Sequence, residues 1–393
     1  MNFKNLRVLV LDGYGRQVPS VVQQLHELGC HITTVSCSKL DPGYASRYPN
    51  KKIISPGFHD DIAEMQTVID SELTSGNYDV VIPVLEPSTN YIVKNADKFG
   101  KYVKIAAAPY EAFVNAYDKE KTLKACQDVG VPCPLTRMDD ESVEEYVAKT
   151  KFPLALKPRK GTGSIGFCKV ETPEELYNMI NEGIIKPEEY VIQEFIPQGG
   201  TRYANNIFVG VDGEIKSSVE VRTVRWFPID GGAGCFTLSC DRPDIKECSV
   251  RLLKAIGWSG FCAVSYIVDP RDNIPKVLEI NGRIPAGVKI CHLCGINVMQ
   301  QMIEAAYGEP VTPLSTDIHN GISIRYFHTD LLWLLKSPNR FKSKPSWFNF
   351  HNSHDYIFSM KDPLPFVTFG LRGLTRFKTE KKKRDRYLSK KGK

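Results

Sequence analysis

Hydrophobic and polar positions in residues 1–108 follow two alternating periods along the chain. Short continuous apolar runs predict buried strands, and longer segments with apolar side chains three and four residues apart predict amphipathic helices. We expect strands at 6–12, 31–36 and 79–85, and helices at 18–29 and 62–73. Strands and helices in alternation predict a parallel sheet covered by helices, which is an α/β domain.

From residue 109 the order of elements changes to a mixture of helices and longer strand-like segments. We expect two short helices within 110–130 and further helices at 172–182 and 296–307. The expected strands are 153–158, 166–170, 190–196, 202–211, 213–224, 260–269 and 275–281. This mixture predicts an α+β fold. Beyond residue 311 the chain is rich in aromatic residues and prolines, and we treat it as a C-terminal extension.

A glycine turn, Gly13-Tyr-Gly15, follows the first expected strand. A dinucleotide-binding fingerprint needs a third glycine there and an acidic residue at the end of the second strand. Val18 and Ser36 stand at those positions. The segment therefore predicts a tight strand-to-helix turn and argues against NAD binding.

The composition is that of a globular protein of two or three domains, with 393 residues, 42% hydrophobic residues and a net charge of +6. Residues 378–393 hold nine Lys or Arg and two acids, so this tail has a net charge of +7 and the rest of the chain −1. The body of the chain has no charge bias toward nucleic acid, and no nucleic-acid partner is expected.

Eleven cysteines, an odd number, are spread from Cys30 to Cys294. No secretory signal precedes them, and no apolar stretch approaches the ~20 residues of a membrane span. Reduced thiols in a cytoplasmic protein are expected. The close pair Cys291 and Cys294 lacks the second pair that a zinc ribbon needs, so buried thiols are the expectation there.

A lysine followed by a glycine-rich turn is the first candidate for chemistry. Lys157 ends an expected strand, and Gly161, Gly163, Ser164 and Gly166 follow it. Glycines let backbone N–H groups approach phosphate oxygens, and the lysine adds a positive charge. The turn is not a Walker loop, because no GK[ST] precedes a helix. Read alone, it is equally a flexible hairpin.

The second candidate lies at the end of the last expected strand, where Glu279, Asn281 and Arg283 follow one another. Alternation places Glu279 and Asn281 on one face, and two oxygen ligands there suit Mg²⁺, or Mn²⁺ in its place. Arg283 can grip a carboxylate or phosphoryl group. Lys119, at an expected helix start, offers a second amine. The alternatives are a surface salt-bridge cluster and a solvated helix terminus.

The order of these motifs resembles the ATP-grasp superfamily, in particular its carbamoyl-phosphate-synthase-like and D-aspartate-ligase-like members. A lysine at a helix start, a lysine before a glycine turn, a strand reading VIQEFI and the motif LEINGR follow one another. The resemblance covers residues 1–310. It implies a Rossmann-like pre-ATP-grasp domain at 1–108, a two-lobed ATP-grasp domain at 109–310 with a mobile lid at about 136–192, and the extension 311–393.

The resemblance also implies roles for single residues. Lys119 and Lys157 resemble the lysines that hold the ATP phosphates, and the glycine turn resembles the loop that closes over them. Glu279 and Asn281 would hold Mg²⁺. Arg283 would stabilise the transferred phosphoryl group or hold the acid substrate. The hinge that faces adenine corresponds to Gln193, Glu194, Phe195 and Ile196.

Two departures from the family pattern concern the metal and the ribose. The penultimate strand usually carries another acidic metal ligand, and by register Ser265 stands there. Either Asp269, four residues on, substitutes for it, or one metal ion is bound weakly. An acid that holds the ribose usually follows the hinge, and residues 198–202 contain none. Further phosphate or substrate contacts are expected from Arg222 and Arg225, for which a surface-strand role is the alternative.

The predicted function is that of an ATP-dependent carboxylate–amine ligase. A carboxylate takes the γ-phosphoryl group to form an acylphosphate, and an amine then displaces phosphate to leave an amide. Such chemistry needs positioning and charge neutralisation, here by Lys157 and Arg283 among others. The expected substrates are a small-molecule amine and an amino-acid or peptide-like acid. The alternatives are a nucleotide-binding module without catalysis and a bicarbonate-activating enzyme.

Residues 365–378 combine aromatic and basic side chains and lead into the basic tail. Peripheral contact with an anionic membrane surface, at the inner face of the membrane, is one interpretation. The other is an aromatic segment packed on the body of the protein, followed by a solvated tail. A homodimer is expected by analogy with the family.

Overall fold

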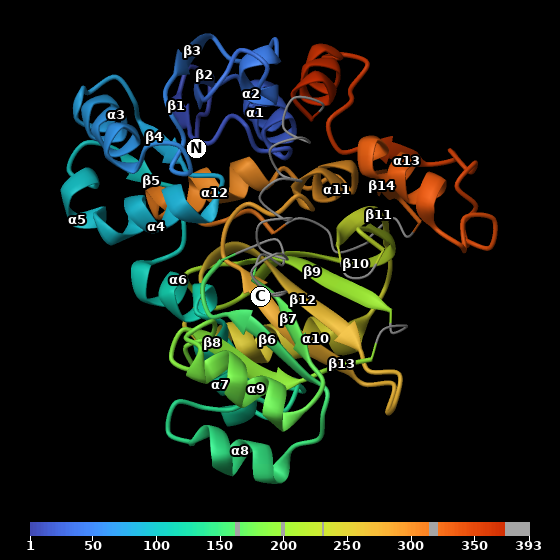
Figure 1. Ribbon diagram of the computed structural model, residues 1–393. Coiled ribbons are helices and arrows are strands. Elements are labelled where there is room, and N and C mark those ends of the chain that lie inside the picture. Colours follow the sequence, from blue (N-terminus) through green and yellow to red (C-terminus); the bar gives the residue numbers. More distant parts are fainter. Residues whose placement is uncertain (162–165, 198–200, 230–231, 314–320, 374–393) are drawn as a thin grey trace. The chain divides into compact units, whose positions relative to one another are not determined.

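The computed structural model describes residues 1–161, 166–197, 201–229, 232–313 and 321–373. The chain divides into two compact units: unit 1 consists of Met1–Ala106 and Asp355–Lys393, and unit 2 of Ala107–His354 (Figure 1). The residues after 310, which the sequence analysis treats as one extension, are thus shared between the units, with the division at His354.

A parallel sheet forms the centre of unit 1, with the strand order β3-β2-β1-β4-β5. The strands are β1 Arg7–Val10, β2 His31–Ser36, β3 Lys51–Ile54, β4 Val80–Ile82 and β5 Lys104–Ile105. The predicted mixture of parallel strands and helices is confirmed. Strands β3 and β5 are not predicted from the sequence, because β3 begins with two lysines and β5 has only two residues.

Helices cover both faces of this sheet (Figure 1). They are α1 Val18–Glu27, α2 Pro42–Ala45, α3 Ile62–Thr74, α4 Glu86–Lys94 and α5 Ala96–Phe99. On one face, Leu9 and Val81 pack with Met65 and Ile69 of α3 and with Phe99 of α5. The apolar period of residues 62–73 therefore marks the face of α3 that is buried.

A helical segment at 364–373 completes the described part of unit 1. The guanidinium of Arg372 pairs with the carboxylate of Asp41 and lies 5.7 Å from the centre of the Tyr14 ring. Asp362 accepts hydrogen bonds from the Ser46 hydroxyl, at 2.5 Å, and from the Arg47 backbone N–H, at 3.1 Å. These contacts fix the segment on the N-terminal α/β domain.

Unit 2 contains a small three-stranded sheet with the order β7-β6-β8. Its strands are β6 Leu154–Pro158, β7 Cys168–Val170 and β8 Tyr190–Glu194, and its helices are α8 Val143–Lys149 and α9 Pro173–Asn181. Leu154, Leu156 and Ile192 from the strands pack with Tyr146 of α8 and Leu176 of α9. This segment has its own core and lies within the region predicted as a lid.

The larger sheet of unit 2 has the order β13-β12-β9-β10-β11-β14-β15. The strands are β9 Arg202–Val209, β10 Ile215–Phe227, β11 Ala233–Ser239, β12 Gly260–Val268, β13 Pro275–Asn281, β14 Ser323–Arg325 and β15 Ser353–Asp355. The predicted strands at 260–269 and 275–281 are confirmed as β12 and β13, an antiparallel pair in which Ser265 stands opposite Glu279.

The helices of unit 2 include α7, which begins at the candidate site residue Lys119. Their bounds are α6 Tyr110–Tyr117, α7 Lys119–Asp128, α10 Pro243–Ala255, α11 Val288–Leu293, α12 Val298–Tyr307 and α13 Phe327–Lys336. Ala116 of α6 and Cys126 of α7 share one core with Val277 and Ile280 of β13. Within the described residues, no helix has both the length and the apolar character needed to cross a membrane.

Candidate functional site

Two lysines distant in sequence converge on the end of β13. Lys157, on the central strand β6, donates a hydrogen bond from Nζ to the backbone oxygen of Leu278, at 3.0 Å. Lys119 is the first residue of α7, and its Nζ lies 4.0 Å from Oε2 of Glu279. Both amines therefore meet the strand that carries the predicted metal ligands.

The start of α7 is fixed by polar contacts. Asp118 caps the helix by accepting from the Glu120 N–H, and it holds the Arg159 guanidinium through two hydrogen bonds of 3.0 and 2.9 Å. The backbone oxygen of Arg159 accepts a hydrogen bond from the Lys119 N–H, at 3.0 Å. Sequence reasoning missed Arg159, because the only local signal is one more basic residue after a strand.

The glycine turn lies next to these amines. Lys119 Nζ donates to the backbone oxygen of Gly161, at 2.7 Å. Gly161 and Gly166 have φ of +122° and +80°, a region that favours glycine, and a Cβ added at Gly166 would lie 2.6 Å from Pro158 Cγ. Gly163 and Ser164 lie outside the described residues. Gly161 therefore lies beside the Lys119 amine, and Gly166 lies beside Pro158, the residue after Lys157.

Glu279, Asn281 and Arg283 form a chain of contacts at the end of β13. Asn281 Nδ2 lies 3.5 Å from Glu279 Oε1 and 3.2 Å from the hydroxyl oxygen of Ser265 on β12. Arg283 donates to Asn281 Oδ1, at 3.1 Å. One carboxylate and one amide oxygen on the same strand face are ligands that fit Mg²⁺ or Mn²⁺. No acidic side chain stands opposite Glu279, because Ser265 occupies that position.

Burial and neighbouring charges change the pKa of Lys157. Burial lowers the pKa of the Lys157 ammonium to about 8; Glu279 acts against this shift and Lys119 with it. An anion placed between the amines would favour the charged form of Lys157. The arrangement is therefore suited to bind a group with several negative charges.

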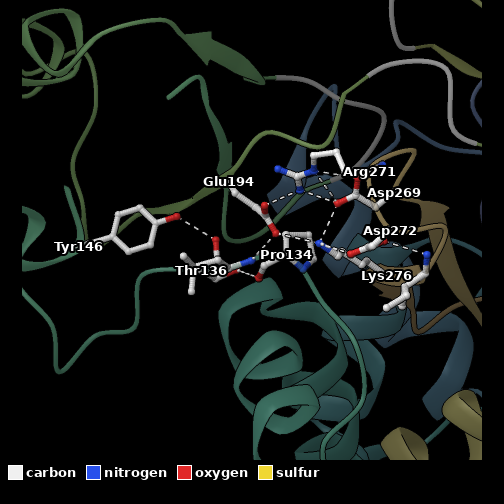
Figure 2. A network of polar contacts seen from close by, with 10 residues as sticks. Pro134, Thr136, Tyr146, Glu194, Asp269, Arg271, Asp272 and Lys276 are labelled. Carbon is white, nitrogen blue, oxygen red and sulfur yellow. Dashed lines mark hydrogen bonds and ion pairs between the residues drawn. The ribbon is translucent and has the colours of Figure 1, made fainter. Parts of the chain in front are cut away.

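Asp269 lies apart from Glu279 and Asn281. It is fully buried at the far end of β12, and its carboxylate accepts from Arg271 Nε, at 2.9 Å, and from Lys276 Nζ, at 2.8 Å (Figure 2). Hydrogen bonds from Arg271, with those from Lys276, hold the pKa of Asp269 well below its usual range, against the effect of burial. The strand position of Ser265 is four residues away, or roughly 13 Å along an extended strand. The carboxylate of Asp269 is therefore paired with two cations, at a distance from the predicted metal ligands Glu279 and Asn281.

The predicted hinge is held by the same network. The Glu194 carboxylate accepts from Arg271 Nη2 at 2.6 Å, from Lys276 Nζ at 3.1 Å and from the Leu135 N–H at 3.0 Å (Figure 2). Its side chain therefore points into an ion network, and the backbone N–H groups of Glu194 and Phe195 donate to the oxygens of Leu135 and Pro153, at 2.8 and 3.2 Å. The other hinge residues lie in order along this edge: Gln193 buried in β8, Phe195 beneath the Lys169 ammonium, and Ile196 buried.

Arg225 does not line a substrate site. It is completely buried, its Nε and Nη2 donate to Asp330 at 2.6 and 2.9 Å, and its guanidinium lies 3.9 Å from the centre of the Phe236 ring. The expected substrate contact is wrong for Arg225, because this cation anchors α13 to the sheet. Arg222 is exposed on β10.

Comparison with known proteins identifies a domain in the central part of the chain. A family model described as "ATP-grasp domain" matches residues 116–287. A D-aspartate ligase of Enterococcus faecium is 24% identical over 296 residues, which cover 68% of each chain. The carbamoyl phosphate synthase large chain of Thermoanaerobacter pseudethanolicus is 23% identical over 48% of this chain, but the match spans only 18% of that protein.

Solved structures support the same fold. The biotin carboxylase domain dimer of a Hydrogenobacter thermophilus 2-oxoglutarate carboxylase, solved with MgADP and bicarbonate, superimposes with a TM-score of 0.64. It is 16% identical and covers 81% of this chain and 73% of that one. At this identity the likeness shows the fold alone. Residues 116–287 of this chain carry an ATP-grasp domain, which confirms the resemblance predicted from the order of its motifs.

Proposed function

We propose that this protein is an ATP-dependent ligase that joins a carboxylate and an amine through an acylphosphate. The observation that carries the proposal is the convergence of Lys119 and Lys157 on the strand end that holds Glu279. Two amines beside a carboxylate and a glycine turn suit a triphosphate with its metal ion. The match of residues 116–287 to an ATP-grasp domain and the similarity to a D-aspartate ligase support the same chemistry.

In this proposal each residue of the site has one task. Lys119, Lys157 and the turn with Gly161, Gly163, Ser164 and Gly166 hold the phosphates. Glu279 and Asn281 would hold Mg²⁺, which would neutralise phosphate charge when bound. Arg283 stabilises the transferred phosphoryl group or holds the acid. The backbone from Gln193 to Ile196 contacts adenine, and Asp269 is left out of the metal site.

The reaction has two balanced steps. A substrate carboxylate oxygen attacks the γ-phosphorus, the bond to ADP breaks, and an acylphosphate forms. An amine then attacks the acyl carbon and gives up a proton, and inorganic phosphate leaves with the bonding electrons. The protein contributes orientation, positive charge and exclusion of water, because an acylphosphate is hydrolysed when water reaches it.

The test is ADP release with pooled amino acids and dipeptides, followed by mass analysis of the amide product. We expect Lys157→Ala and Glu279→Gln to reduce ADP release at least about a hundredfold, as loss of a group that stabilises transition-state charge does. Lys254→Ala and Glu247→Gln, at exposed positions of α10, are the matched controls and should keep full activity. ADP release that survives both site substitutions would remove the proposal.

A second candidate function is nucleotide binding without catalysis. Ser265 opposite Glu279 favours it, because a serine hydroxyl is a weaker Mg²⁺ ligand than a carboxylate. Binding of Mg²⁺ and ATP without ADP release, across all acids and amines tested, would support this candidate. Bicarbonate belongs in the same panel, since release of ADP with bicarbonate alone would indicate a carboxylase-type reaction.

The location, the oligomeric state and a membrane contact of the protein are also proposed. We infer a cytoplasmic enzyme with small-molecule substrates that forms a homodimer, in line with the related domain dimer. Contact with an anionic membrane surface is proposed for the helix at 364–373 and the basic tail. That helix exposes about half of Leu364, Val367 and Leu371, which are spaced to share one face.

A further inference from the structure

Three side chains able to bind a metal ion lie together in unit 1, outside the ATP-grasp domain. Cys37 directly follows β2, and His59 and Asp60 lie in the turn after β3. One ligand atom from each, including Cys37 Sγ, lies within 4.8 Å of the others. Because β2 and β3 are parallel neighbours, the segments that leave their carboxyl ends meet at one edge of the sheet. We name these three residues the Cys–His–Asp cluster.

The backbone of the turn permits the close approach of thiol and imidazole. A Cβ added at Gly57 would lie 2.8 Å from His59 Nδ1 and 2.9 Å from Cys37 Sγ, so a side chain there would push the two apart. The Tyr14 ring packs edge-on against the imidazole, with ring centres 4.9 Å apart. Glycine at position 57 and the Tyr14 ring thus keep the cluster together.

The carboxylate of Asp60 completes the set. One of its oxygens lies 3.3 Å from His59 Nε2 and accepts from the Gly57 N–H, at 3.3 Å. The nearby carboxylate of Asp41 is already used, since it accepts from the Cys37 and Ser38 N–H groups and pairs with Arg372. The cluster therefore brings together three donor types from this chain, and Asp41 fixes the backbone of Cys37.

The donor types indicate which ion fits. One sulfur, one nitrogen and one oxygen are ligands for Zn²⁺, whereas Mg²⁺ and Ca²⁺ prefer oxygen alone. Bonds of about 2.0–2.3 Å in a tetrahedral site place donors roughly 3.3–3.8 Å apart. The donors are within 4.8 Å of one another, and His59 and Asp60 are exposed enough to turn toward a shared ion.

We propose that Cys37, His59 and Asp60 bind one Zn²⁺ ion, with the fourth position taken by water. Burial and the neighbouring Asp41 raise the pKa of the Cys37 thiol to about 12, so binding releases the thiol proton. The site uses none of the residues that we propose to bind ATP. Its test therefore does not depend on ligase activity.

The experiment is a Co²⁺ titration of the reduced, metal-free full chain, followed by displacement with Zn²⁺. A thiolate ligand gives Co²⁺ an intense near-ultraviolet absorption band, which oxygen sites lack. We expect this band to saturate at about one ion per chain, as for a single site of this kind. Cys37→Ser should abolish the band, and His59→Ala or Asp60→Ala should weaken Co²⁺ binding by roughly tenfold or more.

Matched variants separate this site from other thiols and acids. Cys240→Ser changes a half-buried cysteine of unit 2, Glu64→Gln an exposed acid of α3, and Glu279→Gln the proposed Mg²⁺ ligand. All three should keep the band. Gly57→Ala leaves every ligand in place and should still weaken binding, because its methyl group separates the imidazole from the thiol.

Thermal unfolding gives a second measurement. At one Zn²⁺ concentration, the melting temperature should rise for the native chain and for Cys240→Ser, and it should rise less for His59→Ala, because weaker binding stabilises the folded protein less. Full retention of the near-ultraviolet Co²⁺ band in Cys37→Ser would overturn the proposal. So would a native chain that shows neither the band nor a Zn²⁺-dependent shift.

Discussion

At the scale of residues, the surroundings of Lys157 lower the pKa of its ammonium group. Because burial lowers the pKa of its ammonium to about 8, with Glu279 opposing and Lys119 adding to the shift, the charge is lost as pH rises through this value. The pH dependence of kcat/KM reports groups of the free enzyme. We therefore expect kcat/KM for ATP to be constant below pH 8 and to fall about tenfold per pH unit above it.

Lys157→Arg is the control for this prediction. A guanidinium keeps its charge to a pKa above about 12, so the fall above pH 8 should disappear even where the maximal rate is lower. A profile of the arginine variant that still falls above pH 8 would assign the titration to another group. The measurement is initial ADP release at limiting ATP over a pH series.

Asp269 belongs to an ion network and not to the proposed metal site. Asp269→Asn leaves Lys276 and Arg271 without their buried partner. We expect the unfolding free energy to fall by about 3 kcal/mol, at the low end for a broken buried ion pair, because solvent reaches the half-exposed Arg271. The Mg²⁺ concentration for half-maximal ATP binding should stay unchanged. Glu279→Gln should raise that concentration with little effect on stability, and the reverse pattern would restore Asp269 as a ligand.

At the scale of elements, Arg159 ties the start of α7 to strand β6. Its guanidinium contacts Asp118, Glu120 and Asp139, and the first two carboxylates are buried. Arg159→Met should cost about 3 kcal/mol in urea unfolding, because buried acids lose their cation. Arg340→Met, at an exposed position, should change stability by less than about 0.5 kcal/mol. Equal effects of the two would reject the anchoring role.

The helix at 364–373 and the basic tail form the second element with a proposed task. We expect the full chain to float with vesicles rich in phosphatidylserine at low salt, and a chain ending at residue 373 to remain below. Raising the salt should release the full chain, since screening weakens attraction between basic residues and anionic lipid. Val367→Glu tests the exposed apolar face. Identical flotation of all three proteins would contradict membrane contact.

At the scale of the whole molecule, binding of MgATP should appear as a change in the thermal unfolding of unit 2. Lys119, Lys157 and Glu279 all belong to that unit. A ligand at a hundred times its dissociation constant adds about 2.7 kcal/mol to stability. We expect calorimetry to show this shift for the native chain and for Lys254→Ala, and its loss when Lys119 and Lys157 are both changed to Ala. A shift that survives the double substitution would place the nucleotide elsewhere.

Much of the candidate site could be predicted from sequence because its motifs are local. A lysine at the end of a strand, a glycine turn and an acid two residues before an amide are patterns of neighbouring residues. The structure brings Lys119 and Lys157 to the strand of Glu279, and it pairs Ser265 with Glu279. The same local reasoning failed for Arg225, because its partner Asp330 is over a hundred residues away.

The sequence by itself determined the alternation of strands and helices, the order of the ATP-grasp motifs and the types of ligand available. Each of these follows from residues close together in the chain. Only the tertiary structure decided which distant side chains meet: Glu194 with Arg271, Lys119 with Glu279, and Cys37 with His59. Such pairs depend on how sheets and helices pack, and packing satisfies buried charges with partners that no local pattern specifies.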